Sequence, residues 1–288
     1  MEWIRKTGQE ALCIKEKKGV VWLEFPALSS LGMVHHGFST RLGGVSQGKF
    51  ATMNFTFTKG DNPEHVMENY RRMAQALGVD EKRMVLSWQT HTTNIRVVTE
   101  ADAGKGIIRE RDYKDVDGLI TNVPGLTLVT FFADCVPLYI ADPVHGAIGL
   151  SHSGWRGTVC RMGKETLDAM KREYGTQPKD VIVAIGPSIC QDCFEVGEEV
   201  AEAFSEAFRQ VDLPQLYYKK KNGKYQLDLW RANEIIFSEA GVARENIHTT
   251  DICTHCNPEL LFSHRTVGTE RGNLAAFLCL KEQGEKRK

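Results

Sequence analysis

Residues 126–150 read LTLVTFFADCVPLYIADPVHGAIGL and contain three apolar runs, at 126–133, 136–141 and 147–150. Short apolar runs rich in β-branched and aromatic residues are typical of buried strands. Further runs of this kind predict strands on both sides of the stretch, at residues 20–25, 84–88, 181–185 and 274–280. The chain is therefore expected to fold around buried β-sheet.

Helical patterns lie between some of these strands. The clearest begins at Asn62 and Pro63, carries an apolar face as far as Leu77, and stops at Gly78. Further helices are expected at residues 158–174, 196–208 and 231–240. Strands that alternate with helices predict an α/β fold with a mixed sheet. Because no repeat or flexible linker interrupts the sequence, we expect a single domain over residues 1–288.

Charge and hydropathy narrow the classes of partner. The 288 residues include 36 Lys and Arg and 37 Asp and Glu, a net charge of −1 that does not favour nucleic acid or an acidic membrane surface. The most apolar stretch, 126–140, is interrupted by Asp134 and Pro137 and is shorter than the ~20 residues of a spanning helix. With no signal-peptide pattern at the start, a cytoplasmic protein with mostly reduced cysteines is expected.

The strands at 126–133 and 147–150 are followed by a thiol, Cys135, and an imidazole, His152. Such a pair suits either a metal ion or a nucleophile with its base, although a buried structural cysteine is the simpler alternative. His91 follows the run at 84–88 and offers a third ligand. His91, Cys135 and His152 would leave a fourth position on Zn²⁺ open for water or substrate.

Several arginines lie in glycine-rich or strand-ending segments that could meet an anion. Arg156 lies in the turn GWRGT between a predicted strand and helix, where free N–H groups and a guanidinium suit phosphate or carboxylate. His36 and Arg41 belong to HHGFSTRLGGVS, and Arg265 follows the apolar run of LFSHR. Plain structural turns are the alternative for each of these segments.

Two C-x-x-C pairs, Cys190 with Cys193 and Cys253 with Cys256, raise the possibility of a structural zinc site. Their separation of 60 positions is far longer than the roughly 15–20 residues of a zinc ribbon. Ordinary reduced thiols are therefore expected at these four positions.

Taken in order, these segments resemble the YfiH/YlmD family, long described as laccase-like polyphenol oxidases and later recognised as purine nucleoside phosphorylases. The resemblance runs from about Val34 to Phe277. Its motifs here are HGFSTRLGGVS with Asn54 following, QTH, DVDGLIT, ADCVP, HSGWRG, IGPSI, DLWRAN, and FSHR before Arg271. Ser153 stands where alanine is common in the family, and His264 with Thr266 replace part of a Tyr-Arg-Arg pattern.

The resemblance implies a four-layer α/β/β/α sandwich with mixed sheets and a homodimer. It also implies zinc bound by His91, Cys135 and His152, and phosphorolysis of adenosine, inosine and methylthioadenosine, with adenosine deamination as a further activity. Arg156, assisted by Arg41, His36 or Arg265, would hold phosphate. Asp134 would shuttle a proton during deamination, or would only orient a neighbouring ligand.

Three alternatives stay open. A multicopper laccase needs many histidine ligands, mostly in His-x-His pairs, whereas this chain has nine histidines and no such pair. Copper in the single His₂Cys site could still give weak polyphenol oxidation. A metal-free cysteine hydrolase or amidase, for example one that edits a cell-wall precursor, would use Cys135 as nucleophile and His152 as base. A binding module without turnover is the third alternative.

Overall fold

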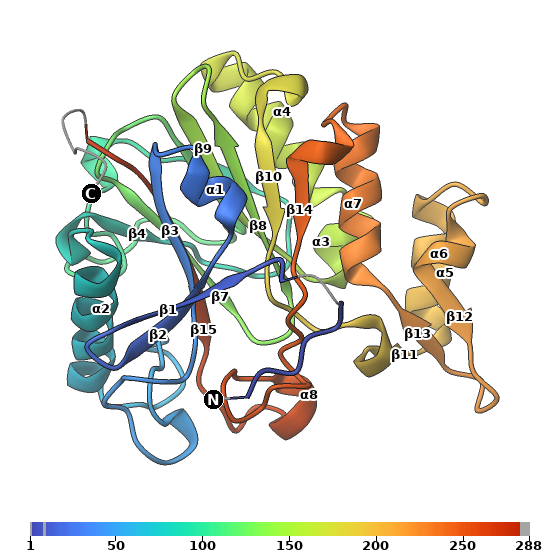
Figure 1. The fold of residues 1–288 in the computed structure, drawn as a ribbon, viewed down its shortest axis with the longest axis horizontal. Helices are drawn as coiled ribbons and strands as arrows, with labels where there is room; N and C mark the ends of the chain where they lie inside the picture. Colours follow the sequence, from blue (N-terminus) through green and yellow to red (C-terminus); the bar gives the residue numbers. More distant parts are fainter. Residues whose placement is uncertain (1, 8–9, 283–288) are drawn as a thin grey trace.

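The computed structural model describes residues 2–7 and 10–282, which form a mixed α/β fold with two large sheets (Figure 1). The first sheet has six strands in the order β1 (Cys13–Lys17), β2 (Val20–Glu24), β3 (Val34–Ser39), β15 (Leu274–Leu280), β7 (Thr127–Phe132) and β4 (Met84–Leu86). The second has six in the order β14 (Ile247–Thr249), β10 (Ile182–Ile185), β8 (Val136–Asp142), β9 (Ala147–Ser153), β6 (Gly118–Thr121) and β5 (Ile95–Val97).

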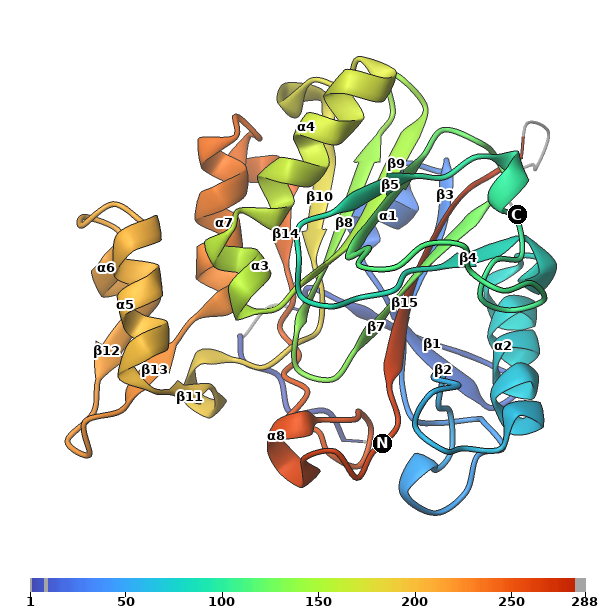
Figure 2. The ribbon, with the colours of Figure 1, turned by 180° about the vertical axis from the view of Figure 1, so that it is seen from behind.

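A small three-stranded sheet and eight α-helices complete the described fold. The small sheet has the order β11 (Glu195–Val196), β13 (Tyr225–Leu227) and β12 (Tyr217–Lys219), and it projects from one side with α5 and α6 (Figures 1 and 2). The helices are α1 (Pro26–Ser30), α2 (Pro63–Leu77), α3 (Trp155–Val159), α4 (Met162–Tyr174), α5 (Glu198–Ala207), α6 (Leu213–Leu216), α7 (Leu229–Glu239) and α8 (His264–Val267). None of the helices in the described ranges has the length and apolar character needed to cross a bilayer.

Alternating side chains along the strands build four layers. In β8, Tyr139 faces the core between the two large sheets, whereas Ile140 faces a second core that includes residues of α4 and α7. In β15, Leu278 belongs to the core between the sheets, whereas Phe277 faces a third core beneath α2. This period of two is the pattern expected of strands that are covered on both faces. The layer order α/β/β/α confirms the predicted fold class.

Strand pairing brings several loops to one edge of the sheets. β4 and β7 are parallel, so the segments that follow them, with His91 and Cys135, leave in the same direction. β8 and β9 are antiparallel with Pro137 opposite His152, which places the end of β9 beside the start of β8. Residues that are far apart in the sequence therefore meet at this edge.

The predicted strands are confirmed to within a few residues, and so is the helix that begins at Pro63. Asn62 caps that helix by accepting a hydrogen bond from the Glu64 amide, and Gly78 ends it with φ 77°. The single helix predicted at 158–174 was wrong, because the chain breaks between α3 and α4. Arg161 at the break has φ 61°, and its guanidinium donates to Glu239 and to the carbonyl of Ala207.

Candidate metal centre

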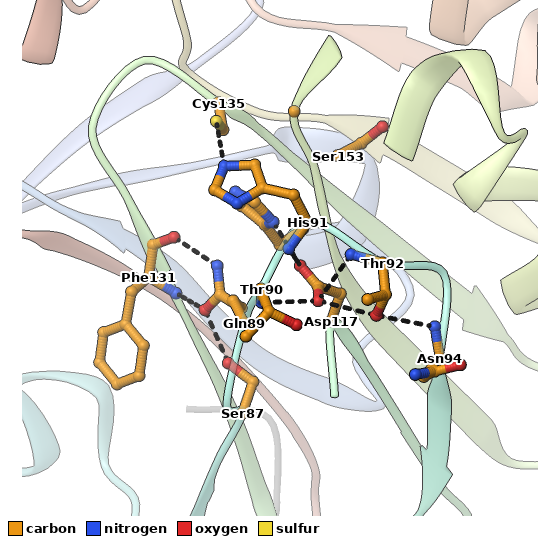
Figure 3. Close-up of polar contacts among 12 residues, drawn as sticks. Ser87, Gln89, Thr90, His91, Thr92, Asn94, Asp117, Phe131, Cys135 and Ser153 are labelled. Carbon is orange, nitrogen blue, oxygen red and sulfur yellow. Dashed lines mark hydrogen bonds and ion pairs between the residues drawn. The ribbon is translucent and has the colours of Figure 1, made fainter. Parts of the chain in front are cut away.

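His91, Cys135 and His152 lie together at this edge. Their ligand atoms are all within 4.8 Å of one another, and Nε2 of His91 is 3.9 Å from Sγ of Cys135 (Figure 3). The rings of His91 and His152 meet edge to face, with centroids 4.9 Å apart. One nitrogen or sulfur from each residue can thus point at a common centre. The structure brings together the three residues that the sequence suggested as a metal site.

Asp117, a fully buried carboxylate just before β6, holds two of these residues in place. Its Oδ1 lies 2.8 Å from Nδ1 of His152 and accepts a hydrogen bond from the His91 amide at 3.0 Å. Its Oδ2 accepts from the amides of Thr90 and Thr92 at 2.9 and 3.1 Å (Figure 3). Because Nδ1 of His152 donates to Asp117, Nε2 keeps a free lone pair for a metal or a proton.

The sequence did not identify Asp117 as a site residue. It lies inside the DVDGLIT motif, and an acid between apolar neighbours is the only signal that could have marked it. Although burial alone would raise the pKa of Asp117, its hydrogen bond to His152 and the backbone amides lower it below the usual value. Asp117 is therefore an anion that fixes the His152 ring.

Cys135 and His152 influence each other's protonation. Burial alone would raise the pKa of the Cys135 thiol, but His152 and His91 together lower it to about 6. Burial alone would lower the pKa of His152, but the Cys135 sulfur and Asp117 raise it to about 9. Without a metal, the two side chains therefore favour a thiolate and an imidazolium at neutral pH. A thiolate is the form in which cysteine binds a metal or attacks a carbon atom.

Two backbone features shape the centre. A Cβ added to Gly154, which follows β9, would lie 2.9 Å from Cδ2 of His91 and 3.1 Å from Sγ of Cys135. Gln89 clamps the loop that carries His91, since its side chain accepts from the Phe131 amide and donates to the Phe131 carbonyl, at 2.7 and 2.8 Å (Figure 3). The loop is thus tied to β7 on one side and to Asp117 on the other.

A cavity of about 430 Å³ opens beside the three residues. Its lining includes aromatic rings from several segments and two arginines, Arg111 and Arg271. Arg111 donates to the Ser87 carbonyl and stacks on the Trp88 ring, with its Cζ 4.4 Å from the centroid. Burial lowers the pKa of both arginines, so each is a partly desolvated cation. The sequence reasoning missed them as anion contacts, although Arg271 ends the last motif of the resemblance.

The four residues that the sequence suggested for phosphate lie elsewhere. His36 is buried, its Nε2 accepts from the Phe25 amide at 2.9 Å, and burial lowers its pKa to about 3, so it carries no charge. Arg41 donates to the carbonyls of Ala51 and Pro258. Arg156 is exposed and stacks on Trp155. Arg265 donates from its guanidinium to the Glu195 carbonyl. None of the four is among the residues that line the described cavity.

Asp134 directly precedes Cys135 and has a positive φ of 87°. Its Oδ1 accepts from the Thr254 hydroxyl and its Oδ2 from the Arg265 amide, both at 2.6 Å. It is not among the residues that line the described cavity. The structure thus uses both carboxylate oxygens of Asp134 to anchor the turn that carries Cys135.

These features, a thiol and two imidazoles beside buried cations at the edge of a mixed α/β sandwich, define the site of an enzyme. Residues 35–281 match the family described as multi-copper polyphenol oxidoreductase laccase, and the chain belongs to this family. It is 37% identical over 260 residues to the purine nucleoside phosphorylase of Bacteroides thetaiotaomicron, covering 90% of this chain and 96% of that protein.

Two further comparisons agree in extent. Adenosine deaminase RL5 from an unknown prokaryotic organism is 36% identical over 238 residues, which are 82% of this chain and 90% of that protein. The crystal structure of YlmD from Geobacillus stearothermophilus matches with a TM-score of 0.87 at 32% identity, over 95% of this chain and 100% of that one. The resemblance to YlmD-type proteins is confirmed.

Proposed function

We propose that the protein is a purine nucleoside phosphorylase, which splits adenosine, inosine or methylthioadenosine with phosphate. The observation that carries this proposal is one cavity that combines the His91, Cys135 and His152 cluster with two partly buried arginines. The names of the similar proteins from Bacteroides thetaiotaomicron and Geobacillus stearothermophilus support the same activity. The relative named adenosine deaminase supports deamination as a second reaction at the same centre.

The three clustered residues fit a zinc ion. Two imidazoles and a thiolate are a suitable donor set, and Asp117 already holds His152 in the tautomer that leaves Nε2 free. Zinc bound there would supply Lewis acidity and would lower the pKa of a water molecule. Copper would fit the same ligands, because divalent copper generally outcompetes zinc for nitrogen and sulfur donors.

Arg111 and Arg271 would bind phosphate. Nε of Arg271 is buried and has no hydrogen-bond partner within the described part of the chain, although its Nη1 donates to Gly272 and Asn273. A desolvated guanidinium is stabilised by an anion that accepts its hydrogen bonds, and phosphate accepts them in pairs. These two cations replace the four residues suggested by the sequence as the proposed phosphate contacts.

The aromatic part of the cavity would bind the base. Phe57, Trp88 and Phe131 line the same space, and flat rings stack favourably on purines. With the base against these rings and phosphate on the arginines, the anomeric carbon would lie between them. The arginines would then hold the attacking oxygen close to that carbon and stabilise charge as the glycosidic bond breaks.

The proposal predicts products that can be separated by chromatography. The protein should release adenine or hypoxanthine with ribose 1-phosphate from adenosine or inosine, and only when phosphate is present. Arg271→Met should reduce phosphate-dependent kcat/KM by at least about 100-fold, as expected for loss of a charged transition-state contact. Arg172→Met, on the exposed side of α4, is the matched control and should retain activity.

Cys135→Ala should abolish both reactions, since it removes a ligand of the centre. Release of a free base without ribose 1-phosphate, or no release at all from any metal-loaded form, would contradict the proposed phosphorylase activity.

A metal-free cysteine hydrolase is the second candidate. The arrangement of Asp117, His152 and Cys135, in which an acid orients an imidazole beside a thiol, is also that of a nucleophile with its base. Hydrolysis of an amide by chelator-treated protein, with loss of activity on alkylation of Cys135, would favour this candidate over the phosphorylase.

A further inference from the structure

Two C-x-x-C segments that are distant in the sequence meet in the structure. Cys190 and Cys193 follow β10, and Cys253 and Cys256 follow β14. β10 and β14 are parallel neighbours with Val183 opposite Ile247, so both segments leave the sheet at the same edge. The four sulfur atoms all lie within 4.8 Å of one another, and those of Cys193 and Cys256 are 3.5 Å apart. We call these four residues the cysteine tetrad.

We propose that the cysteine tetrad binds a structural Zn²⁺ ion, separate from the centre at Cys135. Four thiolates in two C-x₂-C pairs are the ligand set of closed, tetrahedral zinc sites. With Zn–S bonds of about 2.3 Å, tetrahedral geometry puts neighbouring sulfurs about 3.8 Å apart, within the range that the tetrad shows. The absence of any nearby imidazole or carboxylate from this group favours zinc over harder metal ions.

Backbone amides support the sulfur atoms. The Cys190 amide donates to Sγ of Cys253 at 3.3 Å. Within each pair, the backbone of the second cysteine also hydrogen-bonds the sulfur of the first, Cys193 to Cys190 and Cys256 to Cys253. Amides directed at sulfur stabilise the negative charge of thiolates that bind a metal.

The N-terminal segment supplies compensating charge. The ammonium group of Lys6 pairs with Asp192, between the first two cysteines, at 3.0 Å, and it also interacts electrostatically with Cys190 and Cys256. Four thiolates around one Zn²⁺ would carry a net charge of −2, which a neighbouring cation offsets. Cys190 and Cys253 are almost completely buried, so solvent alone would not stabilise charge on them.

The metal would brace the turn before Cys135. Ile189, next to the first pair, donates from its amide to the Asp134 carbonyl at 3.0 Å. Thr254, inside the second pair, donates from its hydroxyl to the Asp134 carboxylate at 2.6 Å. An ion that locks the two segments to each other would therefore fix Asp134, and through it the position of Cys135.

The test uses the full chain with Cys135→Ala, which removes a ligand from the other centre. Elemental analysis should find one zinc per chain, and X-ray absorption at the zinc edge should find four sulfur neighbours at about 2.3 Å. Adding Cys193→Ser, at a partly exposed position, should lower zinc content to near zero after dialysis against a mild chelator. Adding Cys160→Ser, at an exposed cysteine outside the tetrad, should leave it unchanged.

The absorption measurement needs no tetrad variant, so the test holds even if Cys193→Ser fails to fold. Absence of zinc from the Cys135→Ala protein would overturn the proposal. So would nitrogen or oxygen neighbours around the zinc, iron in its place, or a mass lower by two hydrogens for each disulfide formed. Because the readout is metal content and coordination, its result does not depend on the phosphorylase proposal.

Discussion

Asp117 links the backbone of one ligand to the ring of another. Both of its oxygens are used, one by His152 and the His91 amide, the other by Thr90 and Thr92. Rotation of the His152 ring would break a charge-assisted hydrogen bond in a buried site, which costs more than the same break in water. The carboxylate therefore converts a flexible loop and a rotatable ring into one rigid unit.

Asp117→Asn should weaken zinc binding at Cys135 by about 10- to 100-fold, as is usual for loss of a carboxylate behind a histidine ligand. An amide cannot accept all of the hydrogen bonds made by the two carboxylate oxygens, so the loop and ring both lose support. The measurement is the rate of Cys135 alkylation at increasing free zinc, followed by mass spectrometry of the peptide. Asp115→Asn is the control, since Asp115 bonds the Thr90 hydroxyl from an exposed position.

Equal loss of zinc protection in Asp115→Asn and Asp117→Asn would contradict a specific role for Asp117. It would show instead that any change beside the loop disturbs the centre.

The junction of β9 and α3 places backbone where a side chain would otherwise be. Gly154 is the N-cap of α3 and has φ −72°, which any residue can adopt, so its requirement is one of space and not of conformation. The close approach of His91 and Cys135 is possible because nothing projects from this position.

Gly154→Ala should therefore push the two ligands apart and reduce kcat/KM by at least about tenfold, because small displacements of reacting groups are costly. Gly157→Ala, three residues further along, is the matched control, since the nearest atom to its added Cβ is 3.6 Å away. Steady-state kinetics of base release by both variants would check this. Comparable losses in the two variants, or none in Gly154→Ala, would contradict the spatial argument.

The elements could be predicted largely from apolar runs, but their neighbours could not. The runs at 126–133 and 136–141 mark β7 and β8 because burial on both faces demands continuous apolar residues. β14, only three residues long, has no such run, and it is the strand that brings Cys253 beside Cys190. The expectation of separate, ordinary thiols followed from the 60 intervening residues. Parallel pairing with β10 makes that separation irrelevant.

Across the molecule, the candidate site was predictable where a motif carried it. His91, Cys135 and His152 each end or follow a recognisable strand, and they do meet. Arg111 and Arg271 had no such signal, because their importance comes from burial beside the cavity and not from their neighbours in the sequence. His36 shows the converse error: a histidine in a glycine-containing motif was expected at an anion, yet it lies inside the fold.

The buried His36 should make the stability of the whole molecule depend on pH. Its ring, on β3, accepts the Phe25 amide and is desolvated, so burial lowers its folded pKa to about 3 from an unfolded value near 6.5. The unfolded chain therefore binds a proton below about pH 6.5 that the folded chain refuses. This contribution to stability is complete above that pH and is lost as pH falls toward 3.

One such group changes the free energy of unfolding by at most about 1.4 kcal/mol per pH unit, or about 2 kcal/mol between pH 6.5 and pH 5. His36→Gln keeps an acceptor for the Phe25 amide without the titration, so its stability should fall less over this interval than that of the wild type. Urea unfolding at several pH values gives both curves, with His264→Gln, at an exposed position, as control. If His36→Gln loses stability as steeply as the wild type, His36 is not the group that couples folding to pH, and acid sensitivity must arise from other groups in the fold.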